Sequence, residues 1–491
     1  MDLDNLASLD YFSPELILAG AMLLVIFLDL MVKNKRVIGA LSILGCLASL
    51  GATLQLYGGP SGYLFHRMMA LDSFSLFFKI VALTATIIVL WMSFSSREVE
   101  SMHQGEYAAI LLSSALGMFF MASATNLLMA YLSLEMVSIT SYILTGFLPR
   151  NRRSSEAALK YLIYGGVASG AMIYGMSWIF GITGSLDYAH IHAALFQSGP
   201  NRLPIFIALT LILAGFGYKI VFVPFHMWSP DVYQGAPTPF TAFLSVASNA
   251  AGVAILLRFF FTVSEPARDG SWLYLEGVEW PQVLLVVSMI TMTLGNLSAL
   301  SQQNLKRMLA YSGIAHAGYI LMGLVALNTE GLQAMLFYIV VYLIMNLGAF
   351  LVVVLVANAT GKEEIEGYRG LAWRGSAVPA VAMAIFMFSL TGLPPLAGFV
   401  GKFFLFAAVI KQQLYFLALV AVANSVISLY YYARVVKVMF LDFPEPSDGR
   451  VEVNASAATL LGLLSAMTLV FGVYWGPLVA FTSQSVKFFT K

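Results

Sequence analysis

Three ionisable residues lie inside long apolar stretches of this sequence, and their types point to proton chemistry. Glu135 falls near the middle of the apolar run 126–148, while Lys219 and Lys402 each lie close to prolines that interrupt such a run. Ionisable groups at membrane depth cost several kcal/mol and mark ion or proton pathways. Burial weakens the proton affinity of a lysine and a nearby carboxylate strengthens it, so such a pair can load and release a proton.

Two histidines and a third lysine are weaker candidates for the same chemistry. Histidine is the side chain best suited to relay protons near neutral pH. His316 lies between the two proline-interrupted stretches and His226 lies within one of them, although a hydrogen-bonded core histidine explains both equally well. Lys160 stands one turn inside an apolar stretch, from which its ammonium can extend to the polar surface.

A structural interpretation competes with the functional one for the remaining buried charges. Glu135 also fits an ion pair with a neighbouring helix, although function is the default for a carboxylate at membrane depth. Asp29 and Arg258 lie near the ends of apolar stretches, and Lys79 can extend along its own stem. We therefore leave these last three out of the predicted site.

The composition places these charges in a membrane. Of 491 residues, 59% are hydrophobic and only 10% are charged, with a mean hydropathy of +0.83, whereas soluble domains carry about 25% charged residues. At about 20 residues per helix, we predict one all-α, polytopic membrane domain over 1–491 with about fourteen transmembrane helices. The apolar runs are continuous rather than alternating, which favours helices over a barrel. The predicted spans are 14–32, 37–57, 72–94, 107–124, 126–148, 156–182, 204–235, 238–262, 281–301, 308–327, 331–357, 378–411, 413–440 and 457–483.

Two predicted spans, 204–235 and 378–411, are too long for one straight helix. Their interrupting prolines are Pro224, Pro230, Pro394 and Pro395. Broken spans at corresponding places in two parts of a chain are typical of inverted repeats in transporters. Because these spans lie five apart, an odd number, the second unit is turned over relative to the first. We predict two inverted five-helix repeats, 107–262 and 281–440, each with one broken helix.

Several classes of site are absent from the sequence. Cys46 is the single cysteine, so this chain alone holds no disulfide framework, structural zinc site or cysteine-ligated iron–sulfur cluster. The stretch 398–402 has the wrong spacing for a phosphate-binding loop, and no His/Cys set has metal-ligand spacing. The net charge of +1 indicates no nucleic-acid partner. Acidic residues precede the first apolar run, so we expect no secretory signal.

The loop charges predict an orientation. Lys and Arg concentrate in cytoplasmic loops of membrane proteins. The loops of one side hold Lys33, Lys35, Arg36, Arg97, Arg150, Arg152, Arg153, Lys306, Arg307, Lys362, Arg369, Arg374, Arg434, Lys437 and Arg450. The other side holds little more than Arg67, Arg202, Arg268 and Lys411. The first side is therefore predicted to be cytoplasmic, with both termini outside.

The stretch 219–239, which reads KIVFVPFHMWSPDVYQGAPTP, resembles a signature of proton-pumping NADH:quinone oxidoreductase, respiratory complex I. Support comes from YLSLE at 131–135, from QNLKRMLAYS at 303–312 and from the stretch 393–402. The resemblance to the antiporter-like subunits of that complex covers nearly the whole chain. The combination of a glutamate in the fifth span with lysines at broken helices resembles the pattern of every antiporter-like subunit, including the subunits of Mrp-type antiporters. The segment PDVYQGAP at 230–237 resembles the corresponding segment of the subunit N family in particular.

The resemblance implies a polar axis of water and side chains at mid-membrane. Glu135, Lys219 and Lys402 would be its titrating members, and Lys160 would contribute. It implies no cofactor in this chain, because FMN, iron–sulfur clusters, NADH and quinone belong to partner subunits. The implied partners are other membrane subunits of the complex, including neighbouring antiporter-like subunits, in the inner membrane of a bacterium.

One position departs from the family pattern. The family often has a lysine in the eighth span where this chain has Asn249. Asparagine can hydrogen-bond water but cannot carry the proton. Ordered water near Asn249 and His316 would therefore have to bridge the two halves of the route.

The sequence thus predicts a proton-translocating subunit of an NADH:quinone oxidoreductase, an enzyme of class EC 7.1.1.-, without a redox centre of its own. A subunit of a Mrp-type sodium/proton antiporter is the first alternative, which sodium-dependent transport would favour. A membrane scaffold whose buried charges only fix helix register is the second, and unchanged pumping after removal of those charges would favour it.

The loop charges generate a test of the predicted topology. Reporter fusions placed after Arg153 and after Arg374 are expected to give cytoplasmic signals, because both sites follow clusters of basic residues. A fusion after Arg202 is expected to read external. A cytoplasmic signal at Arg202 would contradict the fourteen-span arrangement.

Overall fold

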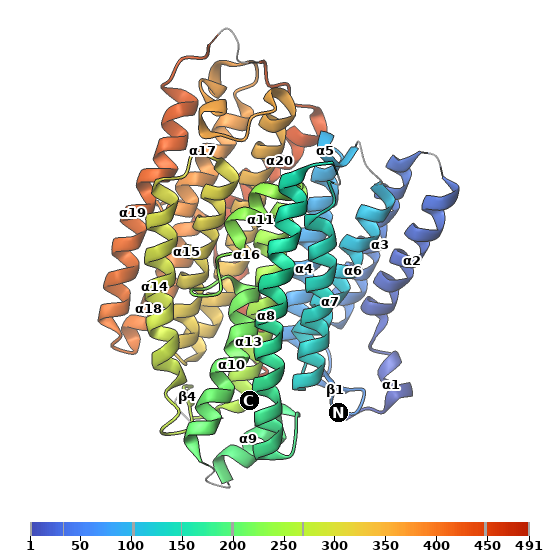
Figure 1. Ribbon diagram of the computed structural model, residues 1–491, viewed down its shortest axis with the longest axis vertical. Coiled ribbons are helices and arrows are strands. Elements are labelled where there is room, and N and C mark those ends of the chain that lie inside the picture. The colour runs from blue at the N-terminus through green and yellow to red at the C-terminus, as the bar shows by residue number, and fades with distance from the viewer. Residues whose placement is uncertain are drawn as a thin grey trace.

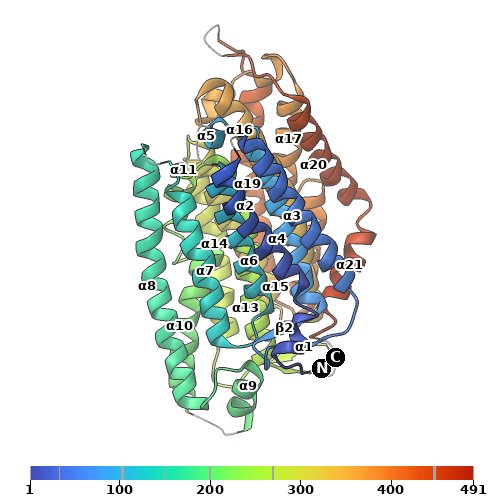
Figure 2. The same cartoon turned by 90° about the vertical axis from the view of Figure 1, so that its right-hand side faces the viewer.

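The computed structural model describes residues 2–32, 34–100, 104–148, 150–197, 201–267, 270–445 and 449–489. Two of the loop charges counted above, Lys33 and Arg268, lie outside the described residues. The long helices run side by side in an elongated bundle (Figures 1 and 2). Both termini lie at the end of the bundle that carries α9 (Tyr188–Gln197) and the hairpins (Figure 1), as an even number of crossings requires.

The remaining elements follow in chain order. The first half contains α1 (Asn5–Leu9), α2 (Ser13–Met31), α3 (Lys35–Leu56), α4 (Ser73–Ser93), α5 (Arg97–Glu100), α6 (Gln104–Ser123), α7 (Leu127–Thr145), α8 (Arg152–Thr183), α10 (Arg202–Ile220), α11 (Ser229–Gly235), α12 (Thr238–Phe243), the π turn η1 (Leu244–Ser248) and α13 (Asn249–Val263). The second contains α14 (Trp280–Leu300), α15 (Leu305–Val325), α16 (Thr329–Thr360), the 3-10 turns η2 (Ile365–Tyr368) and η3 (Leu371–Trp373), α17 (Val378–Thr391), α18 (Ala397–Lys411), α19 (Tyr415–Phe440), α20 (Ala455–Val473) and α21 (Gly476–Val486). The antiparallel hairpins pair β1 (Gly62–Leu64) with β2 (Met69–Leu71), and β3 (Glu265–Pro266) with β4 (Trp272–Leu273).

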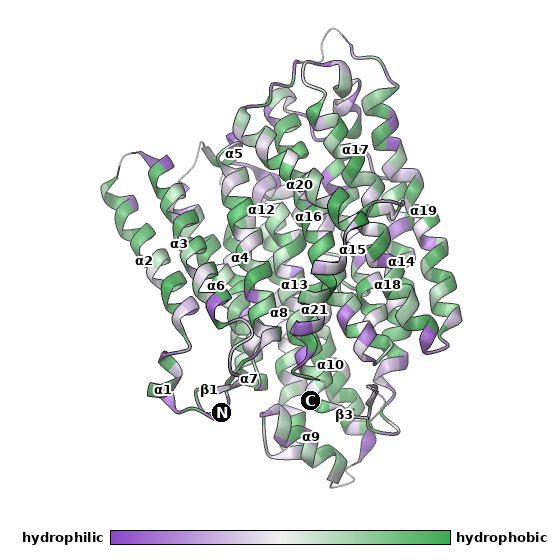
Figure 3. Cartoon of the chain, turned by 180° about the vertical axis from the view of Figure 1, so that it is seen from behind, coloured by the Kyte–Doolittle hydropathy of each residue, from purple (hydrophilic) through white to green (hydrophobic). Residues whose placement is uncertain are grey.

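The all-α membrane fold is confirmed. Within the described residues, thirteen helices are long and apolar enough to cross a membrane, one of them the continuous span from α12 through η1 to α13. The pair α17 and α18 supplies a further crossing in two pieces, each too short to span alone. Apolar residues dominate along the length of the helices (Figure 3).

Both predicted breaks are present. The first separates α10, which ends at Ile220, from α11, which begins at Ser229. The second separates α17 from α18, and Gly392 ends α17 in the left-handed conformation, with a φ of 92° that glycine adopts without strain. The two broken helices run in opposite directions, since α10 begins at the end of the bundle that holds the termini and α17 begins at the other end (Figure 1).

The last predicted span, 457–483, is wrong in one respect. The chain leaves the helix after Val473 and begins α21 at Gly476, so the segment is two helices instead of one. Pro477 occupies the second position of α21, where a proline has no backbone hydrogen bond to lose. Gly472, at the end of α20, lies against the backbone of Pro395 in the second break. This close contact with the break is not visible in the hydropathy of the segment.

The centre of the bundle is formed by α13, α15 and α16, which are buried almost throughout. In contrast, α2, α14, α19 and α20 expose much of their apolar surface. Lipid is a good solvent for exposed apolar side chains, so hydrophobicity alone does not sort these helices into inner and outer positions. Asn249 and His316 lie on these helices. Lys219 packs on Gly252 of α13, and Lys402 lies over the ring of Tyr319 on α15.

One buried ion pair joins the N-terminal helices to the rest of the bundle. The Nζ of Lys79 on α4 lies 2.5 Å from Oε1 of Glu15 on α2, and both side chains are almost fully buried. The interpretation that Lys79 extends to the membrane surface is therefore wrong. Its partner is 64 residues away in sequence, at the start of another helix, so local spacing gave no signal for the pair.

A second buried ion pair links three helices near the end of the bundle that holds the termini. Arg258 on α13 donates to both carboxylate oxygens of Asp72 at 2.7 and 2.9 Å, and its Nε donates to the carbonyl of Ala122 at 2.9 Å. Both charged side chains are 0% exposed. Asp72 also accepts from the backbone N–H of Ser75 and thereby caps α4. The pair fixes α4, α6 and α13 relative to one another.

Replacement of Arg258 by Met is expected to destabilise the chain by about 3–5 kcal/mol, because it leaves the Asp72 carboxylate buried and unpaired. Thermal unfolding in detergent and the amount of chain in membranes measure the loss. The double variant Arg258→Met with Asp72→Asn is expected to recover part of it, since asparagine is neutral and still caps a helix. An equal loss in the single and double variants would contradict this account.

Candidate proton-transfer site

Lys219 lies at the end of the first half of a broken helix. It is the penultimate residue of α10, and Val221 follows in the left-handed conformation with a φ of 70°. The lysine is 1% exposed, and its Nζ has no hydrogen-bond partner in the described part of the chain. Its stem packs on Gly252 of α13, where an added Cβ would lie 3.1 Å from Lys219 Cγ. The ammonium is thus held by its stem, with its polar end unsatisfied by protein.

Glu135 is placed beside this lysine by α7. Ser169 of α8 donates a hydrogen bond to its carboxylate, and the carboxylate lies within electrostatic range of Lys219. Among the described residues the two charges form no direct ion pair. The predicted Glu135 and Lys219 neighbourhood is therefore present as an electrostatic interaction without a direct ion pair.

Lys402 lies on the other side of the second break, in the second turn of α18. Its Nζ donates to the carbonyl of Thr391 at 2.9 Å and to Ser425 Oγ at 2.8 Å, and lies 4.5 Å from the ring centroid of Tyr319. Thr391 is the last residue of α17, so its carbonyl is free of the helical ladder. This lysine, unlike Lys219, is held by the broken helix itself.

His316 is buried at the centre of the second half. Its Nδ1 lies 2.6 Å from the hydroxyl of Tyr338 on α16, and its Nε2 lies 3.1 Å from the hydroxyl of Tyr432 on α19. The ring is within electrostatic range of Lys402. Both ring nitrogens therefore have protein partners, and the histidine connects α15 to two neighbouring helices.

Asn249 begins α13 immediately after the π turn η1. A π turn inside an α-helix leaves backbone carbonyls without their usual partners and is frequent at functional sites. Asn249 donates to the carbonyl of Ser245 at 3.1 Å, while its buried Oδ1 has no partner among the described residues. It lines a cavity of about 20 Å³ together with Ile220, Gly313, Ala317 and Tyr342. That volume fits about one water molecule, and the hydroxyl of Tyr342 is likewise buried and unpaired in the described structure.

Lys160 takes part in a different cluster. Its Nζ lies 2.6 Å from Asp231 Oδ2 and 2.7 Å from Glu156 Oε1, and its side chain is 38% exposed. Asp231 on α11 also binds Arg307 of α15 at 2.5 Å. The carboxylate of Asp231 thus joins α8, α11 and α15. No direct contact connects Lys160 with Glu135 among the described residues, so any link between them is indirect.

His226 lies in the loop between α10 and α11. It is 6% exposed, and its Nδ1 has no hydrogen-bond partner in the part of the chain that the structure describes. The histidine therefore lies near the first break, in the segment that follows Lys219, and is separate in sequence and in contacts from the His316 network.

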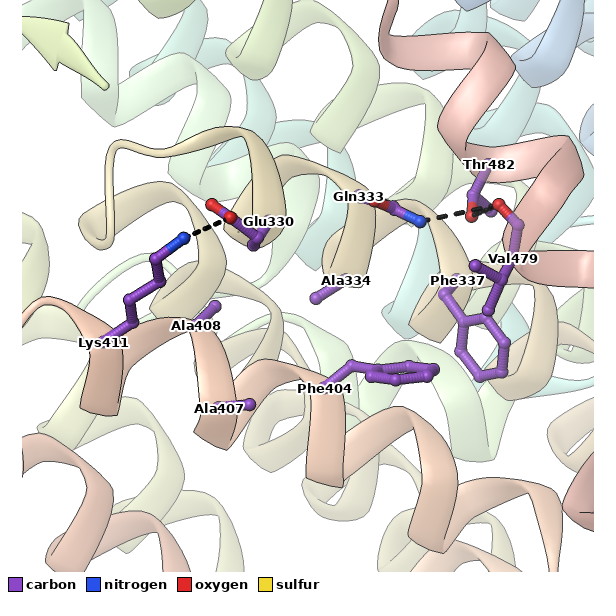
Figure 4. A pocket seen from close by; sticks show the side chains of 10 residues that line it. All are labelled: Glu330, Gln333, Ala334, Phe337, Phe404, Ala407, Ala408, Lys411, Val479 and Thr482. Carbon is purple, nitrogen blue, oxygen red and sulfur yellow. Dashed lines mark hydrogen bonds and ion pairs between the residues drawn. The ribbon is translucent and has the colours of Figure 1, made fainter. Parts of the chain in front are cut away.

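A cavity of about 350 Å³ lies away from these residues, between α16, α18 and α21 (Figure 4). Its wall is apolar, with Phe337 and Phe404 among the lining side chains, and its rim carries the ion pair of Glu330 with Lys411. These two are the only ionisable residues in the lining, and both are exposed. The cavity contains no buried proton-binding group.

Sequence reasoning missed the hydroxyl groups of the site. Ser169, Tyr338, Tyr342 and Tyr432 carry no charge, and tyrosine contributes to the apolar composition, so neither charge nor hydropathy marks them out. Asp231 stood within the quoted signature, but its position on a short helix at the break gave no signal for its two basic partners. Only the packing of helices distant in sequence brings these groups to the charged residues.

The comparisons with known proteins agree with this architecture. Residues 124–428 match the family described as NADH:quinone oxidoreductase/Mrp antiporter, TM, so the chain belongs to this class of membrane subunits. It is 46% identical over 509 residues to NADH-quinone oxidoreductase subunit N of Anaeromyxobacter sp. (strain Fw109-5), covering 99% of this chain and 98% of that protein. The chain is thus a member of the subunit N family.

Solved structures agree as well. A chain of respiratory complex I from Thermus thermophilus with bound aureothin is 29% identical, with a TM-score of 0.79, covering 95% of this chain and 98% of that one. A chain of the Mrp complex from Dietzia sp. DQ12-45-1b has a TM-score of 0.85 at 21% identity, covering 97% and 96%. The second likeness shows a shared fold.

The cavity beside Asn249 predicts how substitutions at this residue affect proton transfer between the two halves of the protein. Asn249→Leu is expected to slow proton transfer, because leucine has a similar size but removes the polar group that can hold water. Asn249→Lys is expected to be tolerated, since it restores the pattern common in the family. Pumping per electron pair in vesicles that contain each variant measures both effects. Unimpaired pumping by the leucine variant would show that the route avoids this position.

Proposed function

We propose that this chain is a proton-translocating membrane subunit of an NADH:quinone oxidoreductase. The single observation that carries the proposal is Lys219, a buried lysine with no protein hydrogen-bond partner in the described structure, within electrostatic range of Glu135. A lysine in this environment can exist in both protonation states, and the charge of its neighbour shifts the balance between them.

The route runs along the central helices. A change in the charge of a neighbouring subunit, caused by electron transfer to quinone elsewhere in the complex, alters the Glu135–Lys219 pair. The proton released by Lys219 passes the cavity beside Asn249 and reaches the region of His316. Lys402 then exchanges protons with one side of the membrane. Two strongly interacting charges of this kind titrate as a coupled pair.

Lys160 and His226 have supporting roles in this proposal. Lys160 binds Asp231 at 2.6 Å and so connects α8 to the helix that follows the first break. His226 lies in the loop that carries the chain from Lys219 to that helix. Both therefore affect the environment of Lys219 through the position of the broken helix.

The proposal includes the setting of the chain. Both termini lie on the external side of the inner membrane of a bacterium, in line with the loop charges. The partners are other membrane subunits of the complex, including antiporter-like neighbours, while FMN, iron–sulfur clusters and quinone are held by partner subunits. The subunit N relative at 46% identity over nearly the whole chain favours this assignment over a Mrp antiporter.

Lys219→Ala is expected to reduce proton pumping, and with tight coupling NADH:quinone turnover as well, because the proton-binding group is lost. Lys219→Arg is expected to give incomplete rescue, since a guanidinium does not release its proton in this pH range. NADH-driven pumping in vesicles measures the effect, with the assembled complex quantified by its FMN. Lys437→Ala, at a lysine whose side chain is 64% exposed, is the matched control.

Two results would overturn the proposal. Full pumping by the Lys219→Ala variant would support the scaffold alternative, in which the buried charges only fix helix register. A dependence of transport on sodium, with proton pumping absent, would support a Mrp-type antiporter.

A further inference from the structure

Four side chains from three helices form one continuous hydrogen-bonded chain in the second half of the protein. Ser312 Oγ lies 2.5 Å from the Tyr432 hydroxyl, which lies 3.1 Å from His316 Nε2, and His316 Nδ1 lies 2.6 Å from the Tyr338 hydroxyl. All four residues are at most 2% exposed. We call this set the His316 chain.

Both ends of the His316 chain lie against residues of the proposed route. Ser312 is adjacent to Gly313, which lines the cavity beside Asn249. At the other end, the ring of Tyr338 packs against Gly401, where an added Cβ would lie 2.6 Å from Tyr338 Cδ2. Gly401 precedes Lys402 directly. The His316 chain therefore lies between the helix that helps to line the small central cavity and α18, the helix that carries Lys402.

We propose that the His316 chain relays protons from the central cavity toward Lys402, with the hydroxyls of Tyr432 and Tyr338 as the groups that pass protons to and from His316. This inference rests on the proposed function, because it assigns a segment of the same proton route. It adds Ser312 and the two tyrosines to that route.

The relay conserves protons at each step. A proton arriving at Ser312 Oγ displaces the serine proton to the Tyr432 oxygen, and the Tyr432 proton passes to His316 Nε2. The Nδ1 proton of His316 then moves to the Tyr338 oxygen, and the Tyr338 proton leaves toward Lys402. One proton has entered and one has left, and the imidazole has exchanged one neutral tautomer for the other. Rotation of the hydroxyls and return of the tautomer reset the chain.

The hydroxyls of Tyr338 and Tyr432 are not needed to fill space, because the aromatic rings alone fill the buried volume. A phenylalanine would fill nearly the same buried volume as either tyrosine, and a buried hydroxyl is costly unless it is hydrogen-bonded. Tyr107 on α6 provides a contrast within the same protein. It is 1% exposed, and its hydroxyl has no hydrogen-bond partner among the described residues.

The test compares Tyr432→Phe and Tyr338→Phe with the control Tyr107→Phe, each in the intact complex in vesicles. Each relay variant is expected to lower NADH-driven proton pumping by roughly tenfold, since a positioned proton-transfer group typically contributes at least that much. The control is expected to pump at the wild-type rate. The amount of assembled complex is measured by its FMN, so that lost assembly is separated from lost transfer.

Ser312→Ala keeps the proposal testable if a tyrosine variant fails to assemble, because alanine is well tolerated in a helix and removes only the first hydroxyl. It is also expected to slow pumping, and transfer through the altered chain is expected to show a larger ratio of rates in H₂O and D₂O. Wild-type pumping by all three relay variants, alongside lost pumping in Lys219→Ala, would overturn the relay and leave the proposed function standing. Wild-type pumping by Lys219→Ala would remove the proposed function as well.

Discussion

The structure depends on the requirement that charged and polar groups inside a membrane find partners within the protein or in enclosed water. Lipid supplies no hydrogen bonds, so each buried ammonium or carboxylate must be matched by helix ends, hydroxyls or an opposite charge. Arg258 meets the requirement with a bidentate carboxylate and a carbonyl. Lys79 meets it with Glu15. These pairs join helices that are distant in sequence, and each buried charge in them faces an opposite charge.

The two broken helices differ with respect to this requirement. At the second break, the carbonyl of Thr391 is available because the helix ends there, and it accepts from Lys402. At the first break, Lys219 comes before the interruption and its Nζ remains without a partner in the described structure. The two lysines thus occupy different environments, one hydrogen-bonded to a helix end and the other without a protein partner in the described structure.

The polar groups described between Lys219 and Lys402 are uncharged side chains and a small cavity. Asn249 cannot carry a proton, yet it lines a cavity of about one water molecule together with Tyr342, whose hydroxyl has no partner among the described residues. Beyond the cavity, the hydroxyls of Tyr338 and Tyr432 are hydrogen-bonded to the two ring nitrogens of His316. Such groups add no further charge between the two lysines, and so avoid the desolvation cost that another buried charge would bring.

Hydropathy and charge determined much of this protein from the sequence alone: the membrane class, the all-α fold, the number of crossings and both breaks. Those features follow from local composition, since an apolar run of about 20 residues spans a bilayer wherever it lies in the chain. Tertiary structure decided the partners. It placed Glu135 beside Lys219, assigned Lys160 to Asp231, and divided the last span at Val473, because each result depends on helices that are distant in sequence. Hydroxyl groups such as that of Tyr432 gain a role only through packing, which no local pattern encodes.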